Sequence, residues 1–344
     1  MGGNATGGIR LPAEAYRRVE ADVMARLRAV PMLGKAASTI PVAAKRDFGD
    51  LDIVYEALPE GPSVLIEALT PISIAPKAHP ERDPTVSLAI ATPDGPFQVD
   101  LISVPPGTFD FAHRYFSLND LGNLIGRVAR RRGFKHGHVG LQYNFRDPNN
   151  ERRTIALLDV TRDWGDALEF LGYDPIVYER GLAGGIRTLE DMYTYAASSR
   201  FFAPEIFDLT NRNHTARTRE RKRPSYMGFL AWIERTKPVW RPIPSAEEGL
   251  TAAFERWPDF AVAYAAAEAT DQLRQRRAVN FNGDTVASAT GFAGSELGAA
   301  MKRIRESFES VEAFEDWALV ATADDIRERS AAALENAAAE SPSL

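Results

Sequence analysis

Two aspartates, Asp50 and Asp52, stand at the start of an apolar run that ends near Tyr55. Side chains alternate between the two faces of a β-strand, so this spacing places both carboxylates on the same face. Two carboxylates this close resist joint ionisation unless a cation lies between them. A divalent metal that prefers oxygen ligands meets that need, and the pair therefore predicts a metal site. The alternative for the pair alone is an acidic strand start that points at solvent.

A third aspartate, Asp100, stands in an otherwise apolar segment further along the chain. Residues 86–91 and 97–104 are predicted to be the arms of a β-hairpin, because an Asp-Gly turn signal lies between them. A carboxylate inside an apolar arm is costly to bury unless it is paired or bound to metal. If this arm lies beside the strand at 50–55, the three carboxylates converge on one point.

Several segments around these aspartates form a longer pattern. Gly-Asp-Leu-Asp-Ile-Val at 49–54 and Phe-Gln-Val-Asp-Leu at 97–101 are followed by a Tyr-Phe pair at 115–116 and an Asn seven residues after the Phe. An Arg-rich helix at 125–135 and a Gly-Leu pair come next. Together these segments resemble the DNA polymerase β-like nucleotidyltransferase superfamily, and its X-family polymerases in particular. The resemblance covers roughly residues 11–174.

The resemblance implies an α+β fold. A polymerase β-like nucleotidyltransferase palm, with a mixed sheet and helices packed on one side, would be followed by a mainly α-helical domain. In such a palm Asp50, Asp52 and Asp100 are the catalytic residues and the ligands of two Mg²⁺ ions, for which Mn²⁺ can substitute. Asp100 is expected to bind only the ion that activates the attacking hydroxyl. The implied nucleotide-binding residues are Ser38, Lys45, Arg46, Gly49, Tyr115, Phe116, Asn123 and Arg127.

The Gly-Ser turn with which the family grips the nucleotide triphosphate is altered in this chain. Ala37 stands in place of the Gly, and Ile40-Pro41 occupies the ground where the X family usually has arginines. Ser38 still offers a hydroxyl and a backbone N–H to a phosphate. Lys45 and Arg46 could supply the missing positive charge, and the alternative is that both are solvated loop cations.

Two basic regions suit contact with a nucleic-acid backbone. The predicted helix 121–132 leaves its arginines on the exposed side and ends at a Gly133 C-cap. The densest basic run has six Lys or Arg residues between 212 and 223, and aromatic residues follow closely, which suits phosphates and stacked bases. The alternatives are a solvated helix face and a solvated loop before a core-packed helix. The predicted nucleic-acid-binding residues are Arg130, Arg131, Arg212, Arg217, Arg219, Arg221, Lys222 and Arg223.

Length and composition limit the class of protein. The 344 residues suffice for two domains, and 44% hydrophobic content supports buried cores. Apolar runs are broken by charge well before about 18 residues and no secretory leader is visible, so we expect a cytoplasmic protein without a membrane partner. The absence of cysteine excludes disulfides and thiolate metal sites. Because the net charge is −6, nucleic-acid contacts must come from local basic patches.

Other catalytic patterns are absent from the sequence. The five histidines have no catalytic spacing with a nucleophile, and His136-x-His138 has no third ligand nearby, so this pair is read as incidental. Neither a Walker A motif nor a Gly-x-Gly-x-x-Gly motif occurs. Kinase-type and dinucleotide-binding functions are therefore excluded.

The remaining periodicities predict the order of the elements. The C-terminal third is expected to be helical, and two of its helices should begin at the capping boxes Ser245-x-x-Glu248 and Thr322-x-x-Asp325. Its glycine turns at 283 and 291–298 are similar to those in the tail of CCA-adding and poly(A)-polymerase-type enzymes. Helices are expected at 12–29, 164–171 and 189–197, strands at 63–70 and 154–160, and irregular structure at the proline-rich segment 71–84.

Four regions follow from this order. They are a disordered N-terminus at 1–10, a nucleotidyltransferase catalytic domain at 11–174, a helical nucleic-acid-binding domain at 175–335 and a disordered tail at 336–344.

The function predicted is metal-dependent transfer of a nucleoside monophosphate from a nucleoside triphosphate to the 3′ hydroxyl of a nucleic acid, with release of pyrophosphate. The acceptor could be DNA or RNA, a tRNA being one candidate. Alternatives are nucleotidyl transfer to a protein or small-molecule hydroxyl, and a catalytically degenerate nucleic-acid-binding module. The sequence leaves open the need for a template, the nucleotide used and the oligomeric state.

Overall fold

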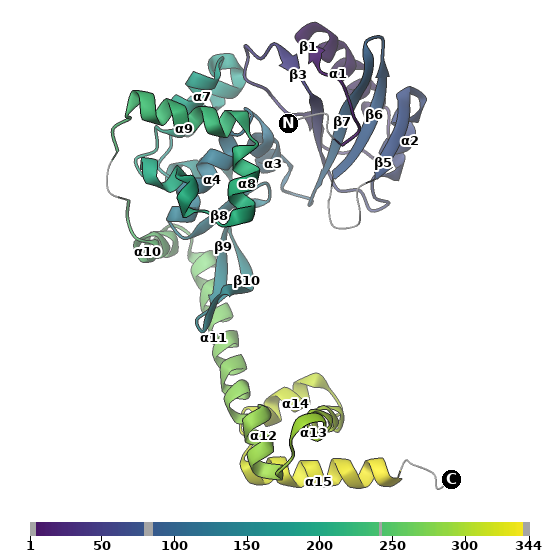
Figure 1. The fold of residues 1–344 in the computed structure, drawn as a ribbon, viewed down its shortest axis with the longest axis vertical. Coiled ribbons are helices and arrows are strands. Elements are labelled where there is room, and N and C mark those ends of the chain that lie inside the picture. The colour runs from purple at the N-terminus through teal and green to yellow at the C-terminus, as the bar shows by residue number, and fades with distance from the viewer. Residues whose placement is uncertain (1–4, 79–84, 241–242, 340–344) are drawn as a thin grey trace. The chain divides into compact units, whose positions relative to one another are not determined.

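The computed structural model describes residues 5–78, 85–240 and 243–339 (Figure 1). The chain divides into two compact units, one comprising Met1–Asn144 and Leu157–Phe260 and the other Phe145–Ala156 and Ala261–Leu344. The α+β class is confirmed, because mixed sheets with helices come first in the chain and a mainly helical part follows from residue 214 onward. The domain boundaries inferred from the sequence stay predictions.

The principal sheet of the first unit has five strands in the spatial order β2-β4-β7-β6-β5. β4 and β7 run parallel and the other neighbours run antiparallel, so the sheet is mixed. β6 and β7 are the predicted hairpin, with a two-residue turn at 93–94. The bounds are β2 Ala36–Ser38, β4 Asp50–Glu56, β5 Ser73–Ala78, β6 Thr85–Thr92 and β7 Gly95–Val104.

One face of this sheet is buried in the main core. Leu51 and Ile53 of β4 and Leu101 of β7 are fully buried there, because residues spaced by two share a face. Helices α1 (Ala13–Arg28) and α2 (Ser63–Leu69) supply the other side of the core. Figure 1 shows both helices in purple and blue beside the sheet. Burial of the intervening apolar residues leaves the aspartates on the opposite face.

That opposite face is covered only in part. Val54 and Ile102 form a smaller apolar cluster with Ala112 of helix α3 (Phe109–Phe116). The end of the sheet that carries the aspartates lies outside this cluster.

Two predictions for residues 63–84 are wrong. Residues 63–70 form helix α2 rather than a strand, because Leu65 and Leu69, four positions apart, are both buried on one helix face. The segment 71–78 is not irregular: a 3-10 turn (Thr70–Ile72) leads into β5, which pairs with β6. β5 is an edge strand, where the missing N–H of Pro76 can be accommodated. Residues 79–84 lie outside the described residues.

The remaining elements up to residue 280 follow the prediction more closely. Helix α4 (Leu121–Arg131) is followed by Gly133, whose φ of +91° suits a C-cap glycine. Residues 11–12 (β1) pair with β3 (Asp47–Phe48). A three-stranded sheet contains β8 Phe134–Gly137, β9 Gly140–Asp147 and β10 Asn150–Thr161. The helices that follow are α5 Trp164–Phe170, α6 Pro175–Arg180, α7 Leu189–Ala196, α8 His214–Arg221, α9 Pro224–Thr236, α10 Ala246–Arg256 and α11 Pro258–Asn280. Of these elements, β9, β10 and α11 contain residues of both units.

The second unit is mainly helical. Its core contains Phe281, Val286, Ile304 and Ile326, all buried. Gly291 ends one helix in the left-handed region with a φ of +78°. The helices after residue 280 are α12 Gly283–Thr290, α13 Gly294–Glu306, α14 Val311–Ala318 and α15 Ala323–Ala339.

Both predicted capping boxes are present. The hydroxyl of Ser245 accepts a hydrogen bond from the N–H of Glu248, and the Glu248 carboxylate accepts one from the N–H of Ser245. Thr322 and Asp325 are joined in the same reciprocal way at the start of α15. These bonds satisfy N–H groups that a helix start leaves unpaired.

Candidate metal centre

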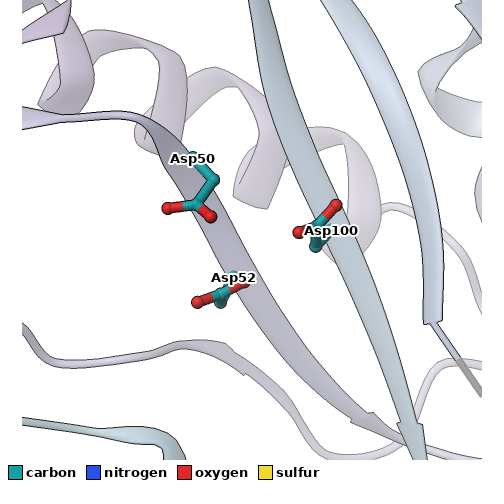
Figure 2. Close-up of side chains that lie close together, drawn as sticks. All are labelled: Asp50, Asp52 and Asp100. Carbon is teal, nitrogen blue, oxygen red and sulfur yellow. The ribbon is translucent and has the colours of Figure 1, made fainter. Parts of the chain in front are cut away.

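The three predicted aspartates converge on one point. Asp52 of β4 lies directly opposite Asp100 of the parallel strand β7, and Asp50 lies two residues earlier on β4. Each offers a carboxylate oxygen, and these oxygens lie within 4.8 Å of one another. Figure 2 shows Asp50 and Asp52 along one strand and Asp100 on its neighbour. The side chains are thus close enough to share a metal ion.

The position of Asp52 makes its negative charge costly. Burial, followed by the neighbouring charges of Asp50 and Asp100, raises the pKa of the Asp52 carboxyl to about 7. Lys45 acts in the opposite direction but does not cancel the effect. A divalent cation between the carboxylates would favour their ionised forms, so the donor set fits a hard metal such as Mg²⁺ or Mn²⁺.

Gln98 holds the third carboxylate in place. Its side-chain Nε2 donates hydrogen bonds to both carboxylate oxygens of Asp100, at 2.8 and 3.0 Å. The Gln98 Oε1 in turn accepts from the backbone N–H of Ala5, at 3.0 Å. Gln98 is buried and lies two positions before Asp100 on the same strand face. Sequence reasoning missed this residue, although its period-two spacing from Asp100 was a usable signal.

A cavity of about 400 Å³ is lined by two of the three aspartates, Asp50 and Asp52, and not by Asp100. Of the predicted residues, Lys45, Gly49, Asp50, Asp52 and Phe116 line it. The other lining residues, none of which was predicted to bind nucleotide, are Arg10, Tyr16, Thr39, Ile40, Pro41, Phe48, Asn119, Asp120, Leu189, Pro224 and Ser225. The cavity is therefore bounded by the sheet on one side and by segments near α4, α7 and α9 on the other.

Lys45 is the cation best placed in this cavity. Its Nζ lies 4.6 Å from the ring centre of Phe48, a cation–π distance. Burial lowers the pKa of the Lys45 ammonium, and the nearby carboxylates of Asp50 and Asp52 oppose that shift. Arg10 also lines the cavity, but its guanidinium is paired with Asp47 at 2.7 Å.

Two other predicted nucleotide-binding residues have different surroundings. Ser38 lies in β2, where its hydroxyl donates to the carboxylate of Glu20 and its carbonyl lies 2.8 Å from Nε2 of His113. Arg46 is exposed and does not line the cavity, whereas its neighbour Lys45 does. Nucleotide binding by Ser38 and Arg46 stays a prediction.

The segment after the Tyr-Phe pair is bound to the loop that follows β2. Leu118 donates its N–H to the carbonyl of Ile40 at 2.6 Å, and Ser117 Oγ accepts from the N–H of Ile40 at 3.0 Å. Leu118 and Asn119 both have positive φ, of 56° and 60°. These two successive left-handed residues turn the chain so that Asn119 and Asp120 line the cavity. Asn119 tolerates such an angle, whereas nothing in the sequence indicated the left-handed conformation of Leu118.

Tyr115, Asn123 and Arg127 take part in contacts within the protein. The Tyr115 hydroxyl donates to Asn123 Oδ1 at 3.3 Å. The Arg127 guanidinium forms a buried ion pair with Glu220 of α8 at 2.5 Å and lines a second cavity rather than that of the aspartates. Their predicted roles in nucleotide binding stay predictions.

The predicted nucleic-acid-binding cations fall into three groups. Arg219 pairs with Glu220 at 3.3 Å, and Arg223 with Asp120 at 3.1 Å. A second group lines the second cavity and consists of Arg130, Arg131 and Arg212. The third group, Arg217, Arg221 and Lys222 on and after α8, forms no ion pair with any described residue. The cations of the first group are thus paired within the protein, whereas those of the other two groups form no ion pair with any described residue.

Comparisons with known proteins supply no further guide. Neither a scan against protein-family models nor a search of curated proteins finds a match for this chain. Within residues 5–78, 85–240 and 243–339, no helix is long and apolar enough to cross a membrane. Conclusions about function therefore depend on the geometry of the site.

Proposed function

We propose that this protein is a metal-dependent nucleotidyltransferase that uses a nucleoside triphosphate. The observation that carries the proposal is the opposition of Asp52 and Asp100 across the parallel strands β4 and β7, with Asp50 on the same face. Three clustered carboxylates, two of which line a cavity, form a donor set suited to Mg²⁺ and to phosphoryl chemistry.

Asp50, Asp52 and Asp100 would hold two Mg²⁺ ions. Bound there, the metal would lower the pKa of an attacking hydroxyl and neutralise charge on the triphosphate and the departing pyrophosphate. The hydrogen bonds from Gln98 orient the Asp100 carboxylate toward the other two. This fixed orientation reduces the reorganisation required when a cation binds.

Residues around the cavity would position the nucleotide. Lys45 presents a partly buried ammonium group beside Asp50 and Asp52, where the phosphates of a metal-bound nucleotide would come to lie. Phe116 and Asn119, on the opposite wall, offer an aromatic ring and an amide to the nucleoside. The backbone hydrogen bond from Leu118 to Ile40 holds this wall in a fixed position.

We further infer that the acceptor is the 3′ hydroxyl of a nucleic acid. The unpaired cations Arg217, Arg221 and Lys222 favour a polyanionic acceptor over a neutral small molecule. A protein or small-molecule hydroxyl is the enzyme alternative, since the same metal site could serve it. A binding module without catalysis is disfavoured, because it would gain nothing from the cost of placing Asp52 beside two like charges.

A transfer assay tests the proposal. The protein is incubated with each α-labelled nucleoside triphosphate, Mg²⁺ or Mn²⁺, and separate acceptors: a single strand, a duplex, a tRNA and the protein itself. We expect label to enter a nucleic-acid strand with equal release of pyrophosphate, and we expect EDTA to stop the reaction. Labelling of the protein alone would select the alternative acceptor. Absence of pyrophosphate release with every triphosphate and acceptor would refute nucleotidyl transfer.

A further inference from the structure

A second cavity in the first unit is lined by arginines and by none of the three aspartates. Its volume is about 640 Å³, and its walls come from α4, the turns at 204–211, α8 and the start of α10. The charged residues of its lining are Arg127, Arg130, Arg131, Arg212 and Glu205. Four guanidinium groups thus face a single carboxylate of the lining.

The cavity keeps an excess of positive charge after its own ion pairs are considered. Arg127 is only 9% exposed and pairs with the fully buried Glu220. Arg130, Arg131 and Arg212 form no ion pair with any residue that the structure describes. Against Glu220 and Glu205, the four arginines leave two positive charges uncompensated.

Hydrogen bonding around the cavity is also incomplete. The Nε of Arg127 and both the Nε and Nη2 of Arg212 are buried without a partner among the described residues. Buried N–H groups of a cation are costly to leave unpaired. Their charge is therefore only partly offset by the protein, and an anion in the cavity would offset the remainder.

We propose that this cavity is a phosphate-binding site. The two uncompensated charges match a phosphate group, and guanidinium forks donate paired hydrogen bonds to phosphate oxygens. The volume exceeds that of a lone phosphate, so the group would be carried by a larger ligand, either one residue of a nucleic-acid strand or a free phosphorylated molecule. Neither the aspartates nor a metal takes part, so the site is independent of the proposed transfer reaction.

Calorimetric titration of the full chain in EDTA tests this site, because without metal the aspartates repel anions. The probes are inorganic pyrophosphate, single-stranded oligothymidylate, and the same oligomer with an uncharged methylphosphonate backbone. We expect saturable binding of pyrophosphate or charged oligomer and none of the uncharged oligomer. Binding of pyrophosphate alone identifies a free phosphate ligand as the source, and binding of the charged oligomer alone identifies a strand.

Variants assign the binding to the cavity. Arg130→Gln and Arg212→Gln should each weaken binding roughly tenfold, as expected for charge-assisted hydrogen bonds. Glu205→Gln should strengthen it a few-fold, because it removes the one carboxylate of the lining. Arg17→Gln, an exposed position on α1 outside both cavities, is the matched control and should leave affinity unchanged. Since Arg130 is exposed, its variant stays informative if Arg212→Gln fails to fold.

Two results would overturn the assignment. One is the absence of saturable binding of both charged probes to the wild-type protein. The other is an equal loss of affinity in Arg17→Gln, Arg130→Gln and Arg212→Gln, which would show attraction to general surface charge rather than to this cavity.

Discussion

The two cavities of the first unit treat buried charge in opposite ways. In the arginine cavity, the buried cation Arg127 has its counter-ion within the chain, since Glu220 lies 2.5 Å away. At the aspartate site the nearest charges to Asp52 are Asp50 and Asp100, which have the same sign, and Lys45 opposes them only in part. The chain thus pairs the buried charge of Arg127 internally and leaves the half-buried charge of Asp52 to be neutralised from outside.

This difference indicates where binding energy is available. The charge of a buried ion that has a counter-ion within the chain is already neutralised, and its pairing supports the fold. A cluster of like-charged carboxylates, in contrast, is stabilised when a cation binds. The aspartates should therefore respond strongly to metal and pH, and Arg127 and Glu220 should respond chiefly through stability. The arginines around that pair, which have no partners of their own, remain available to anions.

The largest expected effect is on catalysis. Asp50→Asn, Asp52→Asn and Asp100→Asn should each lower the rate of nucleotidyl transfer by at least about a thousandfold, or roughly 4 kcal/mol, because each removes a charged metal ligand. Rates of pyrophosphate release measure this. Asp94→Asn, in the exposed hairpin turn, makes the same chemical change and should have no effect. Near-normal rates in all three triad variants would exclude the metal centre as the catalytic site.

The second prediction concerns the internally paired charge. Glu220→Gln leaves Arg127 buried without its counter-ion and should lower the free energy of unfolding by about 3–5 kcal/mol. Denaturant titration of the variant measures the loss. Combining Arg127→Met with Glu220→Leu removes both charges and should recover most of the stability. A loss of unfolding free energy below about 1 kcal/mol in Glu220→Gln would mean that this ion pair contributes no more than an exposed one, and the contrast with the aspartate cluster would fail.

The third prediction concerns the pH dependence of stability that the aspartate site produces. The pKa of Asp52 is about 7 in the folded protein, above its ordinary value of 3.8, so folding favours the protonated acid. This contribution to stability is fully present below about pH 4 and is lost as the pH rises through 7, a change of roughly 2–4 kcal/mol without metal. Denaturant titrations from pH 4 to 8 in EDTA should show this decline.

Two controls assign the decline to Asp52. The Asp52→Asn variant should lose most of it, because the amide does not ionise. Added Mg²⁺ should restore stability at pH 8 in the wild-type protein but much less in the variant, since the cation favours the ionised carboxylate. The same decline in Asp52→Asn as in wild type would assign it to another group.

The three aspartates of the metal centre were predictable because most of the sequence signals that mark them are local. A spacing of two places Asp50 and Asp52 on one face, and an acidic residue inside an apolar hairpin arm marked Asp100. That β4 and β7 are neighbours is a long-range fact, which the sequence left as a condition and the pairing of Asp52 with Asp100 confirms; their parallel direction was not predicted. Residues 63–70 were assigned to a strand because a short apolar run suits either element, although the four-residue spacing of Leu65 and Leu69 indicated a helix.

Charge pairing between distant segments could not be predicted from the sequence. Glu220 lies within the densest basic run, yet it is fully buried because Arg127, 93 residues earlier, reaches it. In the same way Arg223 is paired with Asp120 across 103 residues. Composition alone treats these cations as equivalent, whereas tertiary packing divides them into paired and unpaired groups.

The fourth prediction tests the neighbours Lys45 and Arg46. Lys45 lines the aspartate cavity and Arg46 does not, so Lys45→Gln should weaken triphosphate binding by about 1–3 kcal/mol, the range for a hydrogen bond to a charged group. Arg46→Gln, the matched control, should change it by less than about 0.5 kcal/mol. Calorimetry with a nucleoside triphosphate and Mg²⁺ measures both. A larger effect of Arg46→Gln would move the phosphate site out of this cavity.

The smallest effect expected is on the salt dependence of strand binding, and it separates paired from unpaired cations within the basic run. Each phosphate contact contributes about 0.7 to the slope of log affinity against log salt for a single strand. Replacing Arg217, Arg221 and Lys222 with Gln should therefore reduce the slope by up to about 2. Fluorescence anisotropy of a labelled single strand at several salt concentrations measures this slope.

The matched change is Arg219→Gln with Arg223→Gln, because these residues are committed to Glu220 and Asp120. It should alter the slope much less, even though it removes neighbouring charges from the same run. Equal slopes after both changes would show that internal pairing does not withhold a cation from the strand. If the wild-type protein shows no salt-dependent binding of a single strand, a protein or a small molecule becomes the favoured acceptor. The metal centre would then be tested by pyrophosphate release alone.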